Sequence, residues 1–118
     1  MDARRSGDVD RILRSSVRDL NDALEGGWRP GLHLIGARPF IGKTVLTTQE
    51  VVFTAMTVGP VLYLSFESRR AVIVDGMIAF LSGVPLDTVK APASMTQAEY
   101  DAVDQAMATL EALPITIV

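Results

Sequence analysis

The 118-residue sequence contains no cysteine, only one histidine and no long apolar run. Without cysteine there is no disulfide, no thiolate metal site and no cysteine nucleophile, and a reducing compartment is favoured. A single histidine cannot form a metal site by itself. The apolar stretches are far too short to span a bilayer, and the N-terminus lacks the apolar core of a signal peptide. We therefore expect a soluble, cytoplasmic protein with no membrane partner.

Net charge is also low, at -3 from 11 basic and 14 acidic residues, so bulk charge predicts no affinity for nucleic acid. The charges are unevenly spread along the chain. Residues 1–30 are balanced, residues 31–70 carry a net +2 and residues 71–118 carry a net -5. A phosphate-bearing partner is therefore expected in the middle third. A hydrophobic content of 48% at this length is typical of globular protein rather than of disorder.

Strand and helix patterns alternate along the chain. Residues 1–14 are predicted to form an amphipathic helical lead-in, since Val9, Ile12 and Leu13 begin a helical spacing that Val17 and Leu20 continue. The elements predicted after it are a buried strand at Leu32–Ile35, a helix over 43–58, a strand over 61–66, a helix over 71–81 ended by Gly83, a helix opened by a Thr96–Glu99 capping box and ended by Pro114, and a strand from Ile115. This order predicts an α/β fold with a parallel sheet and flanking helices.

The strongest chemical signal is GARPFIGKT, residues 36–44, which matches the phosphate-loop pattern G-x-x-x-x-G-K-S/T. It follows a predicted strand and opens a predicted helix, where backbone N–H groups and the helix dipole converge on an anion. Lys43 would bridge the β- and γ-phosphates of ATP, and the Thr44 hydroxyl would ligate Mg²⁺. The alternative is a glycine-rich turn with a solvated lysine. The predicted nucleotide-binding residues are Gly36, Ala37, Arg38, Pro39, Phe40, Ile41, Gly42, Lys43, Thr44 and Val45.

Glu67 is predicted, together with Lys43, to be catalytic. It follows the predicted strand over 61–66, at the carboxyl edge where open α/β sheets bind ligands. A carboxylate there could polarise the water that attacks the γ-phosphate. The alternative is a solvated loop carboxylate or a helix cap.

Other polar and aromatic residues carry weaker signals. Arg38 has three alternative interpretations: it contacts phosphate, it contacts a neighbouring subunit, or it is solvated. Arg69 and Arg70 are interpreted as an exposed helix start rather than a nucleic-acid contact. Trp28, in a glycine-rich turn, is interpreted as a packing anchor for that turn.

Taken together, these motifs resemble the ATPase domain of DnaB-type replicative DNA helicases, within the RecA-like P-loop class. The similar segments are RDLNDALEGGWRPGLHLIGARP (18–39), VLYLSFES (61–68), FLSGVPLDTV (80–89), MTQAEYDAV (95–103) and LPITIV (113–118). The resemblance covers about residues 15–118 and implies a RecA-like sheet, ATP and Mg²⁺ as cofactors, phosphate binding by Gly42, Lys43 and Thr44, and Glu67 as base. It also implies DNA unwinding by a homo-oligomeric ring in the complete family protein.

The sequence departs from that family in three respects. Ile41 stands where the family usually has Met, and Ser68–Val72 lacks the polar residues common there. No residue is a candidate for the family's Walker B aspartate, its DNA-binding loops or its arginine finger. We therefore interpret residues 15–118 as the N-terminal part of such a domain, cut before the Walker B strand, with DNA as a partner only of the complete protein. The alternatives are a RecA-like recombination or clock-type ATPase, and a non-catalytic nucleotide-binding or oligomerisation module.

Overall fold

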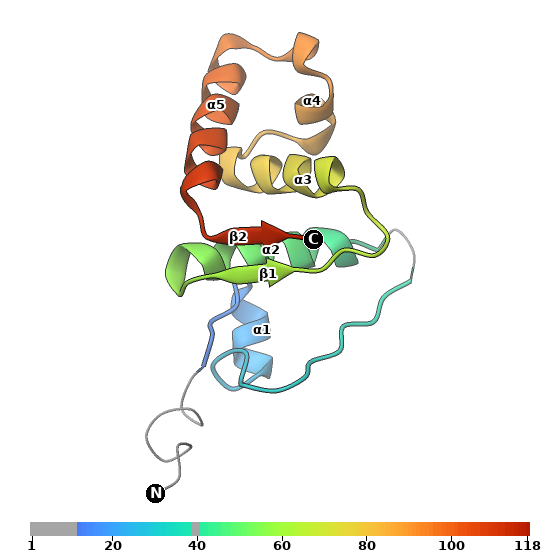
Figure 1. Ribbon diagram of the computed structural model, residues 1–118, viewed down its shortest axis with the longest axis vertical. Helices are drawn as coiled ribbons and strands as arrows, with labels where there is room; N and C mark the ends of the chain where they lie inside the picture. The colour runs from blue at the N-terminus through green and yellow to red at the C-terminus, as the bar shows by residue number, and fades with distance from the viewer. Residues whose placement is uncertain (1–11, 39–40) are drawn as a thin grey trace, which may run out of the picture. The chain divides into compact units, whose positions relative to one another are not determined.

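The structure is a computed structural model that describes residues 12–38 and 41–118. It divides into two compact units, of which the first ends at Thr44 and the second spans Val45–Val118. The elements, labelled in Figure 1, are α1 (Arg18–Ala23), α2 (Lys43–Thr57), β1 (Val61–Tyr63), α3 (Arg70–Ser82), α4 (Leu86–Lys90), the 3₁₀ helix η2 (Pro92–Ser94), α5 (Gln97–Ala112) and β2 (Ile115–Ile117). The fold is thus α/β, with helices flanking a small parallel sheet.

In the first unit, the chain around α1 is held by backbone pairing. Leu13 and Trp28 form an antiparallel bridge in which each N–H donates to the other's carbonyl, at 2.8 and 2.7 Å. The side chain of Asn21 accepts from the Ser15 N–H at 2.7 Å and donates to the Ser15 carbonyl at 2.9 Å. Both residues are buried, and these bonds satisfy polar groups that burial would otherwise leave unpaired.

From residue 12 onward, the helical pattern predicted to begin at Val9 is realised as a helix over Arg18–Ala23. Val9 lies outside the described residues. Residues 12–17 are not helical, because the backbone of Leu13 is committed to Trp28 and that of Ser15 to the Asn21 side chain. Long-range pairing has overridden the local spacing here.

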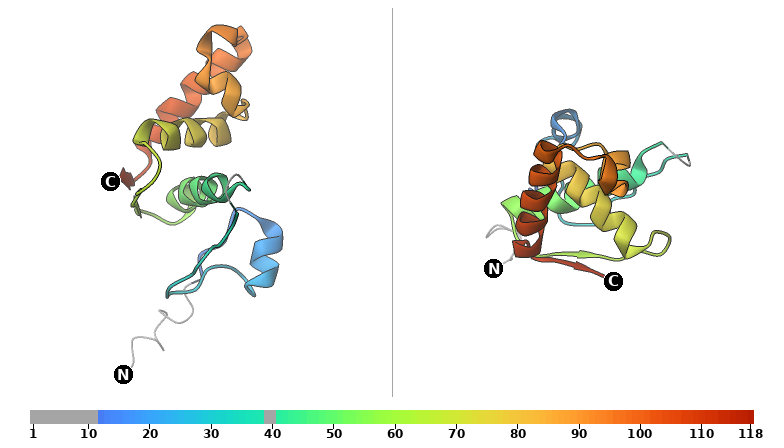
Figure 2. Two further views of the ribbon diagram at one scale, coloured as in Figure 1. Left: turned by 90° about the vertical axis from the view of Figure 1, so that its right-hand side faces the viewer. Right: turned by 90° about the horizontal axis from the view of Figure 1, so that it is seen from above.

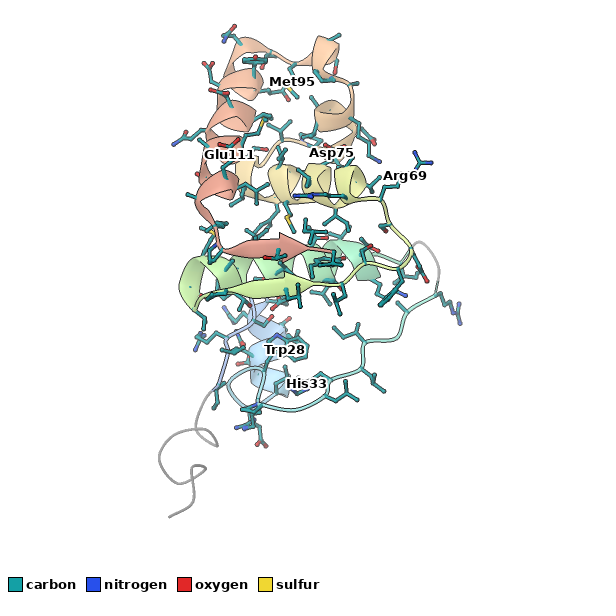
Figure 3. All side chains as sticks on the ribbon, in the orientation of Figure 1. Trp28, His33, Arg69, Asp75, Met95 and Glu111 are labelled. Atoms are coloured by element: carbon teal, nitrogen blue, oxygen red, sulfur yellow. The ribbon has the colours of Figure 1, made fainter. Side chains whose placement is uncertain are left out.

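A glycine is required where this bridge closes. Gly27 has φ of +142°, and a Cβ there would collide with the Leu13 carbonyl oxygen. Beyond the bridge, the Trp28 ring meets the His33 ring edge to face, with centroids 5.0 Å apart (Figure 3). The Arg29 guanidinium donates to the carbonyls of Leu24 and Glu25, at 2.7 and 3.1 Å, where α1 has ended. The turn after α1 therefore contacts the segment before α1, at Leu13, the end of α1, at Leu24, and the segment that follows the turn, at His33.

The prediction of a buried strand at Leu32–Ile35 is wrong. These residues are irregular, and Leu32 and Leu34 are 86% and 88% exposed. A strand needs a neighbour that accepts and donates its backbone hydrogen bonds. In the part of the first unit that the structure describes, the Leu13–Trp28 bridge is the only β-type pairing, so this run has no such neighbour.

The second unit contains the sheet. β1 and β2 are parallel, with Val61 opposite Ile115 and Tyr63 opposite Ile117. β1 ends at Tyr63 rather than at the predicted residue 66, although the Ser65 N–H still donates to the Val118 carbonyl at 3.0 Å. The predicted parallel arrangement of strands is confirmed for this pair.

The helices of the second unit lie on one side of the two strands (Figure 2). Odd-numbered strand residues face them, and Tyr63, Ile115 and Ile117 pack against the buried side chains of Val52, Ile73 and Met77. A second cluster joins α3, α4 and α5 through Ile78, Val84, Val89 and Ala106. The even-numbered Leu62 and Leu64 are more than half exposed, so the apolar core occupies one face of the sheet only.

Local signals predicted the helix ends of this unit well. Gly83, with φ of +73°, caps α3 as expected for a glycine stop. Thr96 and Glu99 form both hydrogen bonds of the predicted capping box, at 3.2 and 3.0 Å, and α5 begins at the next residue after Thr96. The five-residue helix α4 was not predicted, because so short a segment shows no helical period.

Candidate functional site

The predicted phosphate loop is an exposed, irregular segment. Gly36, Ala37, Arg38, Ile41 and Gly42 are all exposed, and the Ile41 N–H donates to the Arg38 carbonyl at 3.3 Å. Pro39 and Phe40, two of the predicted binding residues, lie outside the described residues. The described residues of the loop are therefore accessible to a ligand.

Gly42 is the residue that connects the loop to the following helix. Its φ of +105° lies in a region that residues with a side chain rarely adopt. A Cβ at Gly42 would meet nothing within 4 Å, so the requirement for glycine comes from the backbone conformation and not from crowding. The backbone conformation thus explains why the second fixed position of the motif is occupied by glycine in this chain, at Gly42.

Helix α2 begins at Lys43, immediately after Gly42. Lys43, Thr44 and Val45 form its exposed first turn, which contains no acidic residue. The first N–H groups of an α-helix lack acceptors within the helix, and its dipole places positive charge there. A first turn without carboxylates but with a lysine and a hydroxyl can accept an anion and a hydrated cation together.

Glu67 lies in the second unit, in the bend Phe66–Ser68 between β1 and α3. It is exposed and lies beyond the carboxyl end of β1, separated from Tyr63 by Leu64, Ser65 and Phe66 rather than directly following the strand as predicted. The Ser65 hydroxyl donates to the Ser68 carbonyl at 2.7 Å across this bend. An exposed carboxylate on such a bend can accept a hydrogen bond from water. Lys43 and Thr44 belong to the first unit.

The two arginines after this bend start α3. Arg69 precedes the helix as its N-cap residue without a side-chain cap, and Arg70 is the first helical residue. Both are exposed, and Figure 3 labels Arg69 at this position. Their interpretation as an exposed helix start is confirmed.

The described residues include no group of three or more His, Asp or Glu side chains that could hold a metal ion. Mg²⁺ can instead be held by few protein ligands together with phosphate oxygens and water. The exposed hydroxyl oxygen of Thr44, in the first turn of α2, is a ligand type that fits this mode of Mg²⁺ binding. As to membranes, no described helix combines the length and the apolar character needed to cross one.

Two features of the second unit escaped the sequence analysis. One is the hydroxyl bond of Ser65 across the Glu67 bend. The other is an open cleft of about 270 Å³ between α3, α5 and β2, lined by Arg70, Val74, Met77, Leu110, Glu111, Ile115 and Ile117. The cleft residues come from α3 and from the consecutive elements α5 and β2, which lie far from α3 in sequence, so no local pattern marks the cleft.

Comparison with known proteins gives one match. Residues 13–118 match the family described as "DnaB-like helicase C terminal domain". No curated protein and no solved structure matches the chain. The family match covers the loop Gly36–Val45 and the bend that carries Glu67.

Proposed function

Because the chain belongs to the DnaB-like helicase C-terminal domain family, a family of helicase ATPase domains, we propose that it binds Mg²⁺·ATP through the loop of residues 36–45. The observation that carries this proposal is the junction at Gly42, where a positive φ leads directly into helix α2 at Lys43. This junction aims the first N–H groups of α2 at the exposed loop, which is what phosphate binding requires.

The roles of the loop residues follow from their chemistry. The Lys43 ammonium would contact the β- and γ-phosphates, and the Thr44 hydroxyl would ligate the Mg²⁺ that the nucleotide brings. The backbone of Gly36 and Gly42 allows close approach of the phosphates. Arg38, which is exposed, would contact phosphate or a neighbouring subunit. When bound, Mg²⁺ would neutralise the charge that develops on the phosphate oxygens.

Glu67 would be the base for ATP hydrolysis. In that reaction water attacks the γ-phosphorus, the bond to the β–γ bridging oxygen breaks and ADP leaves. Glu67 would orient the attacking water and accept its proton. Its position after β1, at the carboxyl end of a parallel strand, supports this role.

At the level of the complete family protein, we propose that this chain contributes to a RecA-like ATPase within a homo-oligomeric ring that acts on DNA. The family match supports this proposal and gives no support to a recombination or clock-type ATPase. The net charge of -5 over residues 71–118 is unfavourable for contact with a phosphate backbone, so DNA contacts would lie outside this segment.

The two lysines of the chain allow a matched test of nucleotide binding. Lys43→Ala should weaken Mg²⁺·ATP binding at least tenfold, because it removes the side-chain cation between two phosphates. Lys90→Ala, at the exposed end of α4, removes the same charge elsewhere and should leave binding unchanged. Isothermal titration calorimetry with the full chain measures both affinities. Equal affinities in the two variants would refute the proposed loop.

A further inference from the structure

A single side-chain hydrogen bond closes the bend that carries Glu67. The Ser65 hydroxyl donates to the carbonyl of Ser68, three residues later, at 2.7 Å. Phe66 and Glu67 are the two residues enclosed by this bond. The bond therefore determines how the backbone presents the Glu67 carboxylate.

The bend is also anchored where it begins and where it ends. At its start, the Ser65 N–H donates to the Val118 carbonyl at 3.0 Å and so continues the pairing of β1 with β2. Beyond its end, the Arg69 carbonyl accepts from the N–H groups of Val72 and Ile73 in the first turn of α3, at the position that Figure 3 labels. Ser65 is thus attached to the sheet through its backbone and to the bend through its side chain.

Burial does not restrain the two enclosed residues. The Phe66 side chain is 93% exposed, and Glu67 is exposed as well. An exposed aromatic ring supplies no packing that could hold a bend in one conformation. Between Ser65 and Ser68, the hydroxyl bond is the restraint that the described part of the chain provides.

We propose that Ser65 is a positioning residue for Glu67. Its hydroxyl keeps the bend closed, so that the carboxylate stays where the attacking water has to be oriented. This role rests on the proposed function of Glu67 as the base. Loss of the hydroxyl should slow hydrolysis without weakening nucleotide binding, because displacement of a catalytic group by about 1 Å can cost roughly a hundredfold in rate.

Two substitutions of similar shape isolate the hydroxyl. Ser65→Val and Ser65→Thr both introduce a β-branched side chain that suits the extended backbone here, but only threonine keeps the donor. Ser94 offers a control, because its hydroxyl likewise donates to a backbone carbonyl three residues away. The acceptor is Ala91, which precedes Ser94, and the distance is 2.8 Å. Ser94→Val therefore removes a bond of the same kind at a different site of the second unit.

The first measurement is the backbone order parameter of the Glu67 N–H, obtained by NMR on the full chain. With serine or threonine at position 65 we expect a value of about 0.85, typical of rigid backbone, and with valine a value below about 0.6. Ser94→Val should leave Glu67 rigid. An unchanged order parameter in Ser65→Val, or an equal loss in Ser65→Thr, would overturn the proposal. This measurement does not depend on nucleotide binding.

The second measurement separates positioning from general damage. Under single-turnover conditions in the complete family protein, Ser65→Val should slow ATP hydrolysis between about tenfold and a hundredfold, with an unchanged affinity for Mg²⁺·ATP. In a Glu67→Gln background the same substitution should have no further effect, because the group that it positions is absent. An equal rate loss in both backgrounds would overturn the proposal. Failure of the unsubstituted chain to bind ATP would refute the proposed function instead, and the order parameter would still decide whether Ser65 holds the bend.

Discussion

The runs Leu32–Ile35 and Val61–Tyr63 are both short and apolar, but only the second forms a strand. Val61–Tyr63 pairs in parallel with Ile115–Ile117, and its Tyr63 side chain packs on the core around Met77. Leu32–Ile35 lies in the first unit, where the described residues offer it no strand partner, and Leu32 and Leu34 remain 86% and 88% exposed. Apolar composition therefore makes a strand only where another segment supplies hydrogen-bond partners and cover.

The two units also differ in what is buried. In the described part of the first unit the buried residues are Ser15, Asn21 and Gly27, which are polar or lack a side chain. In the second unit nearly all buried residues are apolar, with Val52, Ile73 and Met77 at its centre. We infer that hydrogen bonds and close backbone approach stabilise the first unit, whereas apolar burial stabilises the second.

The largest expected effect contrasts a buried and an exposed apolar side chain. Met77 of α3, only 1% exposed, packs against α2 and the strands, and Met77→Ala should lower the free energy of unfolding by about 2–5 kcal/mol. Leu34→Ala should change it by less than about 0.5 kcal/mol, because the side chain is already in water. Urea unfolding followed by circular dichroism measures both. Similar losses in the two variants would show that Leu34 is buried in solution.

The next effect concerns the glycine turn of the first unit. Gly27→Ala should lower the stability of this unit by about 1–3 kcal/mol. The alanine would have to adopt a strained φ of +142°, and its Cβ would collide with the Leu13 carbonyl. Gly31→Ala is the control, since it has a similar φ of +137° but nothing within 4 Å of its Cβ.

Trp28, the only tryptophan, reports on this unit by its fluorescence during urea unfolding. The loss of stability in Gly27→Ala beyond the loss in Gly31→Ala measures the energetic cost of the close approach of the Leu13 backbone. Identical unfolding midpoints would contradict the Leu13–Trp28 bridge as the structure describes it.

The smallest expected effect tests a local signal in the second unit. Thr96→Ala removes the side-chain half of the α5 capping box and should cost about 1 kcal/mol. Thr109→Ala, within the same helix and exposed, should cost nothing, because alanine is the better helix former. Thermal unfolding followed by circular dichroism compares the two variants. A loss of stability in Thr109→Ala as large as in Thr96→Ala would refute the role of the cap.

Local signals in the sequence were enough for the start of α2, the end of α3 and the start of α5. The Thr96–Glu99 box, the stop at Gly83 and the change from Gly42 to helix at Lys43 involve residues within one or two turns of each other, so their energetics act locally. The parallel direction of β1 and β2 also followed from the order of the elements, whereas their pairing came from the structure.

Tertiary structure alone decided the features that depend on residues far apart in the chain, or on a single hydroxyl. Leu13 pairs with Trp28 instead of continuing a helix, and Leu32–Ile35 stays exposed because no partner strand lies beside it. The Ser65 bond to Ser68 has no signature in residue type, since serine serves equally well in turns, caps and solvent. The sequence by itself thus located the glycine-containing loop and the start of the helix that follows it. The tertiary structure decided which apolar runs are buried and how Glu67 is held, because burial and hydrogen-bond partners are properties of the folded chain.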